Sequence, residues 1–129
     1  MIVVIEDNEA DVMMLEMTLI QTGVLLTIQS IEDGEEAHRF AEKPTDTPPD
    51  LILLDLNLHK TDGLSVLARL RKNEQLKSVP VVVWSSTRSP RDQELVAALG
   101  VTEFLVKPAT LEGWTALGKK IQSLLSLRS

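Results

Sequence analysis

Residues 50–58 of the chain read DLILLDLNL, and the predicted fold is built around this stretch. Four consecutive apolar residues, Leu51 to Leu54, are followed directly by Asp55. A short apolar run between turn signals is typical of a central strand in a parallel sheet, where both faces of the strand are covered. A carboxylate at the end of a buried strand needs a partner. Asp55 is therefore the first candidate functional residue.

Three other short apolar runs also end in residues with useful chemistry. They are residues 2–5, followed by Glu6 and Asp7, residues 81–84, followed by Ser85, and residues 104–106, followed by Lys107. If the four runs are parallel strands, these side chains meet at the carboxyl edge of one sheet, where open α/β sheets bind their ligands. Three acids, a hydroxyl and a lysine in one crevice suit a divalent cation and a phosphoryl group.

Segments with helical spacing separate the strands. We expect strands over residues 2–5, 24–30, 51–55, 79–84 and 102–106, and helices that begin near Asn8, Asp33-Gly34, Asp62-Gly63, Ser89-Pro90 and Thr110. In the first helix, the apolar positions Val12, Leu15, Leu19 and Ile20 follow helical spacing. The alternation predicts a (βα)5 fold, which is a doubly wound five-stranded parallel sheet of flavodoxin-like topology.

Size and composition restrict the classes of function. The chain has 129 residues, which predicts a single domain over residues 1–129 with no output domain. No segment approaches the roughly 18 apolar residues of a membrane span, and the N-terminus does not resemble a signal peptide. The sequence has no cysteine and a net charge of −6. We therefore expect a cytoplasmic protein that binds neither membranes nor nucleic acid.

The turn after the first strand distinguishes a site for the phosphate of a flavin nucleotide from a site for a metal ion. It reads Glu6-Asp7-Asn8-Glu9, and these acids would repel the bare phosphate of a flavin nucleotide. Carboxylates that share a crevice raise one another's pKa unless a cation lies between them. Mg2+ accepts oxygen-only ligands and is the expected cofactor. An acidic helix start, favoured by the helix dipole, is the simpler alternative for Glu6 and Asp7.

The chain resembles the receiver domain of a two-component response regulator (CheY-like) over residues 2–127. The matching pieces, in order, are residues 4–11, residues 50–58, Asp62-Gly63, residues 80–85 and Val106-Lys107-Pro108. The acidic start and the Trp-Ser-Ser-Thr segment at residues 84–87 are most similar to stand-alone receivers that work with phytochrome-type histidine kinases.

The resemblance implies a role for each candidate residue. Asp55 would accept a phosphoryl group from the phosphohistidine of a sensor histidine kinase, and Lys107 would bind that group. Mg2+ would be bound directly by Asp7 and Asp55, through water by Glu6, and by the backbone carbonyl of Asn57. Ser85 and Phe104 would form the conformational switch, and the Lys107–Pro108 bond would be cis.

Some positions depart from the family pattern or leave alternatives open. His59 stands where proline is common, and an exposed loop histidine is the simpler interpretation. Phe104 lacks the hydroxyl of a tyrosine, so a switch would depend on burial of its ring. Ser85 alone could be an ordinary loop residue, and Lys107 could form a simple salt bridge with Asp55.

Two other functions share features with this pattern. A haloacid dehalogenase-type phosphatase carries an Asp-x-Asp pair on its first strand, where this chain has Glu6-Asp7. A pseudo-receiver scaffold usually lacks an acid or the lysine.

The last helix carries more apolar residues than one buried stripe needs, which predicts a homodimer through that helix. They are Leu111, Trp114, Leu117, Ile121, Leu124, Leu125 and Leu127. The alternative is a monomer whose last helix lies at the edge of the core.

Overall fold

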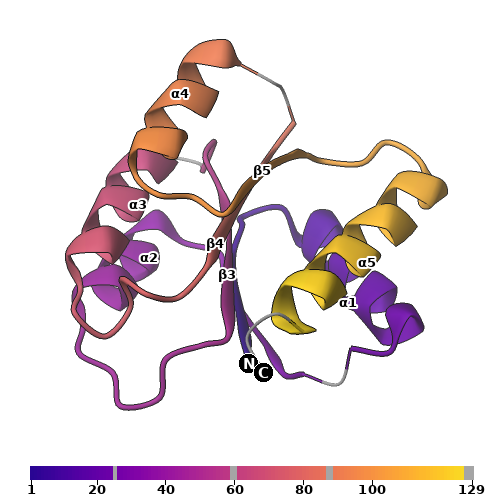
Figure 1. Cartoon of the computed structure of the whole chain (residues 1–129), viewed down its shortest axis with the longest axis horizontal. Helices are drawn as coiled ribbons and strands as arrows, with labels where there is room; N and C mark the ends of the chain where they lie inside the picture. Colours follow the sequence, from indigo (N-terminus) through magenta and orange to yellow (C-terminus); the bar gives the residue numbers. More distant parts are fainter. Residues whose placement is uncertain (25, 59–60, 87–88, 127–129) are drawn as a thin grey trace.

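The computed structural model describes residues 1–24, 26–58, 61–86 and 89–126, and in these residues strands and helices alternate (Figure 1). The strands are β1 (Ile2–Ile5), β2 (Ile28–Ile31), β3 (Leu51–Asp55), β4 (Val81–Ser85) and β5 (Glu103–Val106). The helices are α1 (Glu9–Thr22), α2 (Gly34–Glu42), α3 (Gly63–Lys72), α4 (Pro90–Ala98) and α5 (Leu111–Ser126). Neighbouring strands are parallel, in the order β2-β1-β3-β4-β5. The predicted fold class is confirmed.

The sheet separates two hydrophobic clusters. Figure 1 shows the sheet nearly edge-on, with α1 and α5 on one side and α2, α3 and α4 on the other. Side chains alternate along each strand, so Ile2 and Val4 of β1 join the cluster under α1 and α5. Val3 and Ile5 join the cluster under the other three helices. Two-sided burial explains why the strands are continuous apolar runs.

Short polar side chains begin the helices at the predicted positions. Asn8, Asp33, Asp62 and Ser89 each accept a hydrogen bond from a backbone N–H in the first turn of the following helix. Each cap satisfies a donor that has no partner within its helix. The caps fix where α1 to α4 leave the carboxyl edge of the sheet, and so fix the loops around the candidate site.

The second strand is shorter than predicted, because its first predicted residue belongs to the end of α1. Gly23 has a left-handed backbone with φ 87°, and the N–H of Val24 donates to the carbonyl of Leu19. These bonds close the helix. Pairing with β1 begins only near Thr27, whose carbonyl accepts from the N–H of Ile2. Val24 packs against the cluster under α1 and α5, whereas Leu26 is 38% exposed.

Ile20 follows the apolar spacing of α1, but its side chain is 75% exposed. Val12, Leu15 and Leu19 already fill the face of α1 that meets the sheet. Thr18 takes the position opposite α5, where a Cβ on Gly118 would lie 2.6 Å from the Thr18 methyl group. The close approach of α1 and α5 at this point therefore requires a small residue on each side.

Strand β4 begins at Val81 and not at the predicted Val79. The N–H of Val79 donates to the carbonyl of Leu76 in the preceding turn, and Pro80 has no N–H to give to a sheet.

Among the described residues, no helix combines the length and apolar character that a membrane crossing requires.

Candidate functional site

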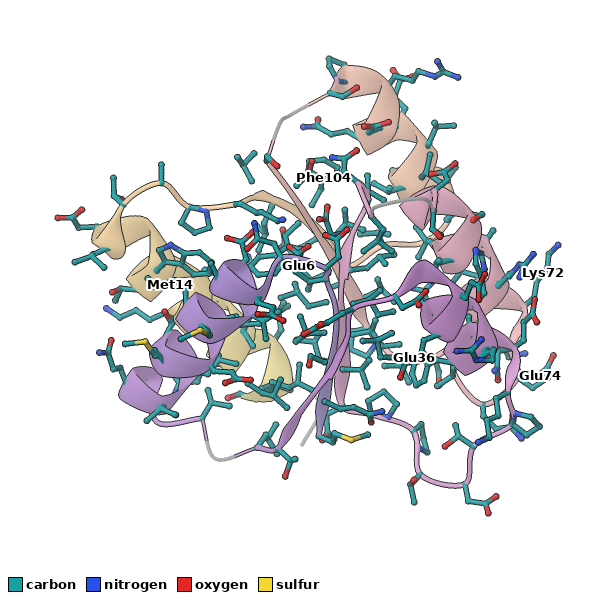
Figure 2. The ribbon with its side chains drawn as sticks, turned by 180° about the vertical axis from the view of Figure 1, so that it is seen from behind. Glu6, Met14, Glu36, Lys72, Glu74 and Phe104 are labelled. Atoms are coloured by element: carbon teal, nitrogen blue, oxygen red, sulfur yellow. The ribbon has the colours of Figure 1, made fainter. Side chains whose placement is uncertain are left out.

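The candidate site lies at the carboxyl edge of the sheet, beside the start of α1. Glu6, Asp55 and Lys107 lie two residues beyond Val4, Leu53 and Leu105, which all pack in or against the cluster under α1 and α5. The alternation of a strand therefore directs these three side chains toward the same side of the sheet. Figure 2 shows Glu6 at this edge, next to α1.

The ammonium group of Lys107 is at the centre of the site. Its Nζ forms ion pairs with Glu6, with Asp11 at 3.0 Å and with Asp55 at 3.1 Å. The Lys107 side chain is only 11% exposed, and its Nζ lies 5.2 Å from the centroid of the Trp84 ring. A cation over an indole face is attracted to the ring. Lys107 therefore does more than form the simple salt bridge with Asp55 that the sequence left open.

Asp11 is a site residue that the sequence analysis missed. It lies in the first turn of α1, where its backbone N–H donates to Oδ1 of Asn8 at 3.2 Å. Asp11 lies on a helix, whereas the predicted candidates lie in or just after strands. The packing of α1 on the side of the sheet that carries Glu6 and Lys107 was the signal that could have found it.

Three of the predicted acids form a compact group. Oxygen atoms of Glu6, Asp7 and Asp55 lie within 4.8 Å of one another. Glu6 and Asp55 are buried, while Asp7 is half-buried. Buried carboxylates this close repel one another unless protons or cations compensate them. The donor set contains only oxygen, which fits Mg2+ or another hard divalent cation.

Burial and neighbouring charges shift the pKa of two groups. Burial raises the pKa of Glu6 to about 8; the hydrogen bond and charge of Asp55 act in the same direction, while Lys107 opposes them. Burial acts to lower the pKa of Lys107, but the carboxylates of Glu6, Asp11 and Asp55 outweigh it and raise this pKa. Lys107 therefore stays charged, and Glu6 is the acid that takes up a proton when no metal is bound.

Asn57 joins Asp55 to Ser85. The backbone N–H of Asn57 donates to Oδ1 of Asp55 at 2.9 Å, and its side-chain Nδ2 donates to Oγ of Ser85 at 3.1 Å. Ser85 is buried, and its carbonyl accepts from the backbone N–H of Lys107 at 2.7 Å. The ends of β3, β4 and β5 are thus connected by hydrogen bonds. Phe104 is half-buried, pairs in register with Val83 and packs against the cluster under α2, α3 and α4 (Figure 2).

Other features around the site differ from the prediction or add to it. The predicted cis bond between Lys107 and Pro108 is wrong: the bond is trans, the more stable isomer of an X–Pro bond. His59 lies outside the described residues.

A hollow of about 770 Å³ opens beside the acids, and its lining residues are Asp7, Asn8, Glu32, Asp33, Gly34, Glu35 and Thr61. Four carboxylates make this hollow attractive to cations.

Comparison with known proteins identifies the family. Residues 2–117 match the family described as response regulator receiver domain. The chain is 32% identical over 126 residues to the response regulator Rcp1 of Synechocystis sp., covering 95% of this chain and 86% of Rcp1.

Two solved structures have the same fold. The phosphorylated cyanobacterial phytochrome response regulator RcpA superposes with a TM-score of 0.86 at 32% identity, covering 99% of this chain and 94% of that one. The Mn2+-bound form of Rcp1 gives a TM-score of 0.82 at 32% identity, covering 95% and 91%. The chain therefore belongs to the response regulator receiver domain family, whose members are phospho-acceptors in two-component signalling.

Proposed function

We propose that Asp55 accepts a phosphoryl group from a histidine kinase and that the phosphorylated chain transmits a signal through a change of conformation. The observation that carries this proposal is the environment of Asp55. It is a buried carboxylate with an ammonium group 3.1 Å from one oxygen and an N–H donor 2.9 Å from the other. A carboxylate held in this way is oriented for attack on phosphorus.

The transfer is a nucleophilic substitution. An oxygen of Asp55 attacks the phosphorus of the phosphohistidine, the P–N bond breaks and the histidine nitrogen leaves with the electron pair. The product is an acyl phosphate. The Lys107 ammonium group donates hydrogen bonds to the phosphoryl oxygens. A positively charged side chain at this position stabilises the negative charge that develops on these oxygens during transfer.

Mg2+ would be held directly by the carboxylates of Asp7 and Asp55 and by the backbone carbonyl of Asn57, and through water by Glu6. The chemistry that the ion supplies is neutralisation of the negative charge shared by the acids and the phosphoryl group. The oxygen-only donor set and the separation of the three acids support this assignment.

Ser85 and Phe104 are the proposed switch. In the described structure the Ser85 hydroxyl accepts a hydrogen bond from Asn57. A phosphoryl group on Asp55 offers the hydroxyl stronger, charged acceptors, so Ser85 would turn toward it. Movement at the end of β4 leaves space that the half-buried ring of Phe104 on β5 can occupy. The signal is then a changed surface around β4 and β5.

The proposed partner is a sensor histidine kinase of the phytochrome type. The similarity to Rcp1 and to a protein described as a cyanobacterial phytochrome response regulator supports this choice. A scaffold that is never phosphorylated remains the second candidate. The acids and the lysine needed for chemistry are in contact, which favours the phospho-acceptor.

The homodimer through α5 stays a prediction, and the structure narrows the surface available for it. Trp114, Leu117 and Ile121 are buried within the chain, whereas Leu111 is 74% exposed. Gly118 is explained by its contact with Thr18 on α1. Leu124 and Leu125 are half-buried, and Leu127 lies outside the described residues. Among the described residues of the predicted set, Leu111 therefore offers the most exposed apolar side chain.

The experiment that tests the proposed function is phosphorylation by a small-molecule phosphodonor with and without Mg2+. Wild-type protein should be labelled only with the cation present, and the Asp55→Asn variant should not be labelled. The amide keeps the shape of the carboxylate but loses the nucleophile. Labelling of the variant at the wild-type rate would contradict the proposal.

A further inference from the structure

The ammonium group of Lys107 has committed all its donors. An ammonium carries three N–H groups, and three carboxylates face this one. They belong to Glu6, which directly follows β1, to Asp11 on α1 and to Asp55 on β3. A phosphoryl group would therefore find no free N–H on Lys107 unless at least one carboxylate gives up its contact.

Two of these three carboxylates are also in the acid group that would hold a divalent cation. Glu6 and Asp55 belong to both sets, whereas Asp11 belongs only to the set around Lys107. A divalent cation between Glu6 and Asp55 would repel an ammonium group that stayed within hydrogen-bond distance of both. The lysine and the cation therefore compete for the same two carboxylates.

We propose that Asp11 is a positioning residue that holds the Lys107 ammonium group when a divalent cation takes Glu6 and Asp55. The contact with Asp11 keeps the lysine in the site, and the two N–H groups released by Glu6 and Asp55 become available to the phosphoryl group. The inference rests on the cation site of the proposed function.

The surroundings of Asp11 suit this role. Its side chain is 23% exposed, so its carboxylate is partly solvated, unlike the buried Glu6. Its backbone is fixed by the bond to Asn8, and the contact with Lys107 is already made at 3.0 Å. The Lys107 ammonium group also lies over the ring of Trp84, 5.2 Å from its centroid. This attraction does not depend on Glu6 or Asp55. The lysine can shift its contacts without leaving these two neighbours.

The test is a double-mutant cycle on Mg2+ binding, measured by calorimetry without a phosphodonor. The four proteins are wild type, Asp11→Asn, Lys107→Met and the double variant. If Asp11 draws the lysine away from the cation's ligands, Asp11→Asn weakens Mg2+ binding by roughly tenfold, and the same change has little effect in the Lys107→Met background. The Lys107→Met variant alone binds Mg2+ more tightly than wild type, because the competing ammonium is absent.

The matched control is Glu9→Gln. Glu9 also lies in the first turn of α1, carries the same charge and is exposed, and it has no ion pair among the described residues. This variant loses the same helix-dipole and long-range charge terms as Asp11→Asn. It should change the Mg2+ affinity by less than about twofold, since it does not contact Lys107.

Each outcome separates the inference from the function on which it rests. If Asp11→Asn weakens Mg2+ binding equally in the wild-type and Lys107→Met backgrounds, Asp11 acts only as a negative charge near the site. That result would overturn the inference. A Glu9→Gln variant as weak as Asp11→Asn would do the same. Failure of the wild-type protein to bind Mg2+ at all would instead contradict the proposed function. A second readout is Trp84 emission, which Mg2+ should change less in Asp11→Asn than in wild type.

Discussion

Replacing Lys107 by Met tests how strongly the site depends on one buried cation. Met keeps much of the length of the side chain and removes the ammonium group. At an effective dielectric constant of about 20, a unit charge 3.1 Å from the Asp55 carboxylate contributes on the order of 5 kcal/mol of attraction. Desolvation of the ammonium offsets part of this. Removing one partner of a buried ion pair usually costs about 3 kcal/mol or more of unfolding free energy.

Glu6 limits the loss, because it can bind a proton. Its pKa, already raised to about 8, rises further when the neighbouring cation is removed, so one charge of the cluster is neutralised at pH 7. We therefore expect metal-free Lys107→Met to lose about 3 kcal/mol of unfolding free energy. Mg2+ should restore more stability to the variant than it adds to wild type, since it binds the acids without a competitor.

The assay is urea denaturation of the metal-free and Mg2+-loaded proteins, with Lys120→Met as the control. Lys120 forms an exposed ion pair with Glu103 at 2.8 Å, and both side chains are about a third exposed or more. Exposed pairs contribute about 1 kcal/mol or less, so Lys120→Met should be close to wild type. Equal losses in the two variants, or a Lys107→Met protein that is more stable than wild type without metal, would refute the reasoning.

Three other predictions concern the packing, the pH dependence and the fluorescence of the protein. Gly118→Ala should lower the unfolding free energy by about 1–2 kcal/mol despite the helix propensity of Ala, because the added Cβ would lie 2.6 Å from Thr18; an increase in the urea midpoint would contradict this. Metal-free stability should fall as the pH rises from about 5 to 8. The folded protein keeps a proton on Glu6 with a pKa of about 8, whereas the unfolded chain releases it near 4.5. The slope should be smaller in Glu6→Gln, and an unchanged slope would assign it to another group. Mg2+ should change the emission of Trp84, which lies beside Lys107; a change of the same size in Trp84→Phe would assign the signal to the other tryptophan.

The fold was predictable because several levels of the sequence agree. The run before Asp55 is apolar at every position, which is typical of a strand covered on both sides, and the caps Asn8, Asp62 and Ser89 mark helix starts at the observed residues. The start of β2 was not predictable from apolar residues alone. Val24 completes the end of α1 through a backbone bond to Leu19, and this local helix-ending bond competes with the preference of valine for strands.

The candidate site was only partly predictable. Strand ends correctly indicated that Glu6, Asp55 and Lys107 would meet, because parallel strands end at one edge of the sheet. Asp11 could not be found in this way, since it approaches from a helix. The acidic hollow beside Asp7 is assembled from three separate loops, and its lining depends on how those loops pack.

The most direct test of the central claim is the location of the phosphoryl group. Wild-type protein is incubated with Mg2+ and a small-molecule phosphodonor, digested at acidic pH to preserve the acyl phosphate, and mapped by mass spectrometry. We predict one modified carboxylate, Asp55, with no modification when Mg2+ is omitted. A phosphoryl group on Asp7 or Asp11, or no modification under conditions that label a related receiver, would contradict the claim that Asp55 is the phospho-acceptor.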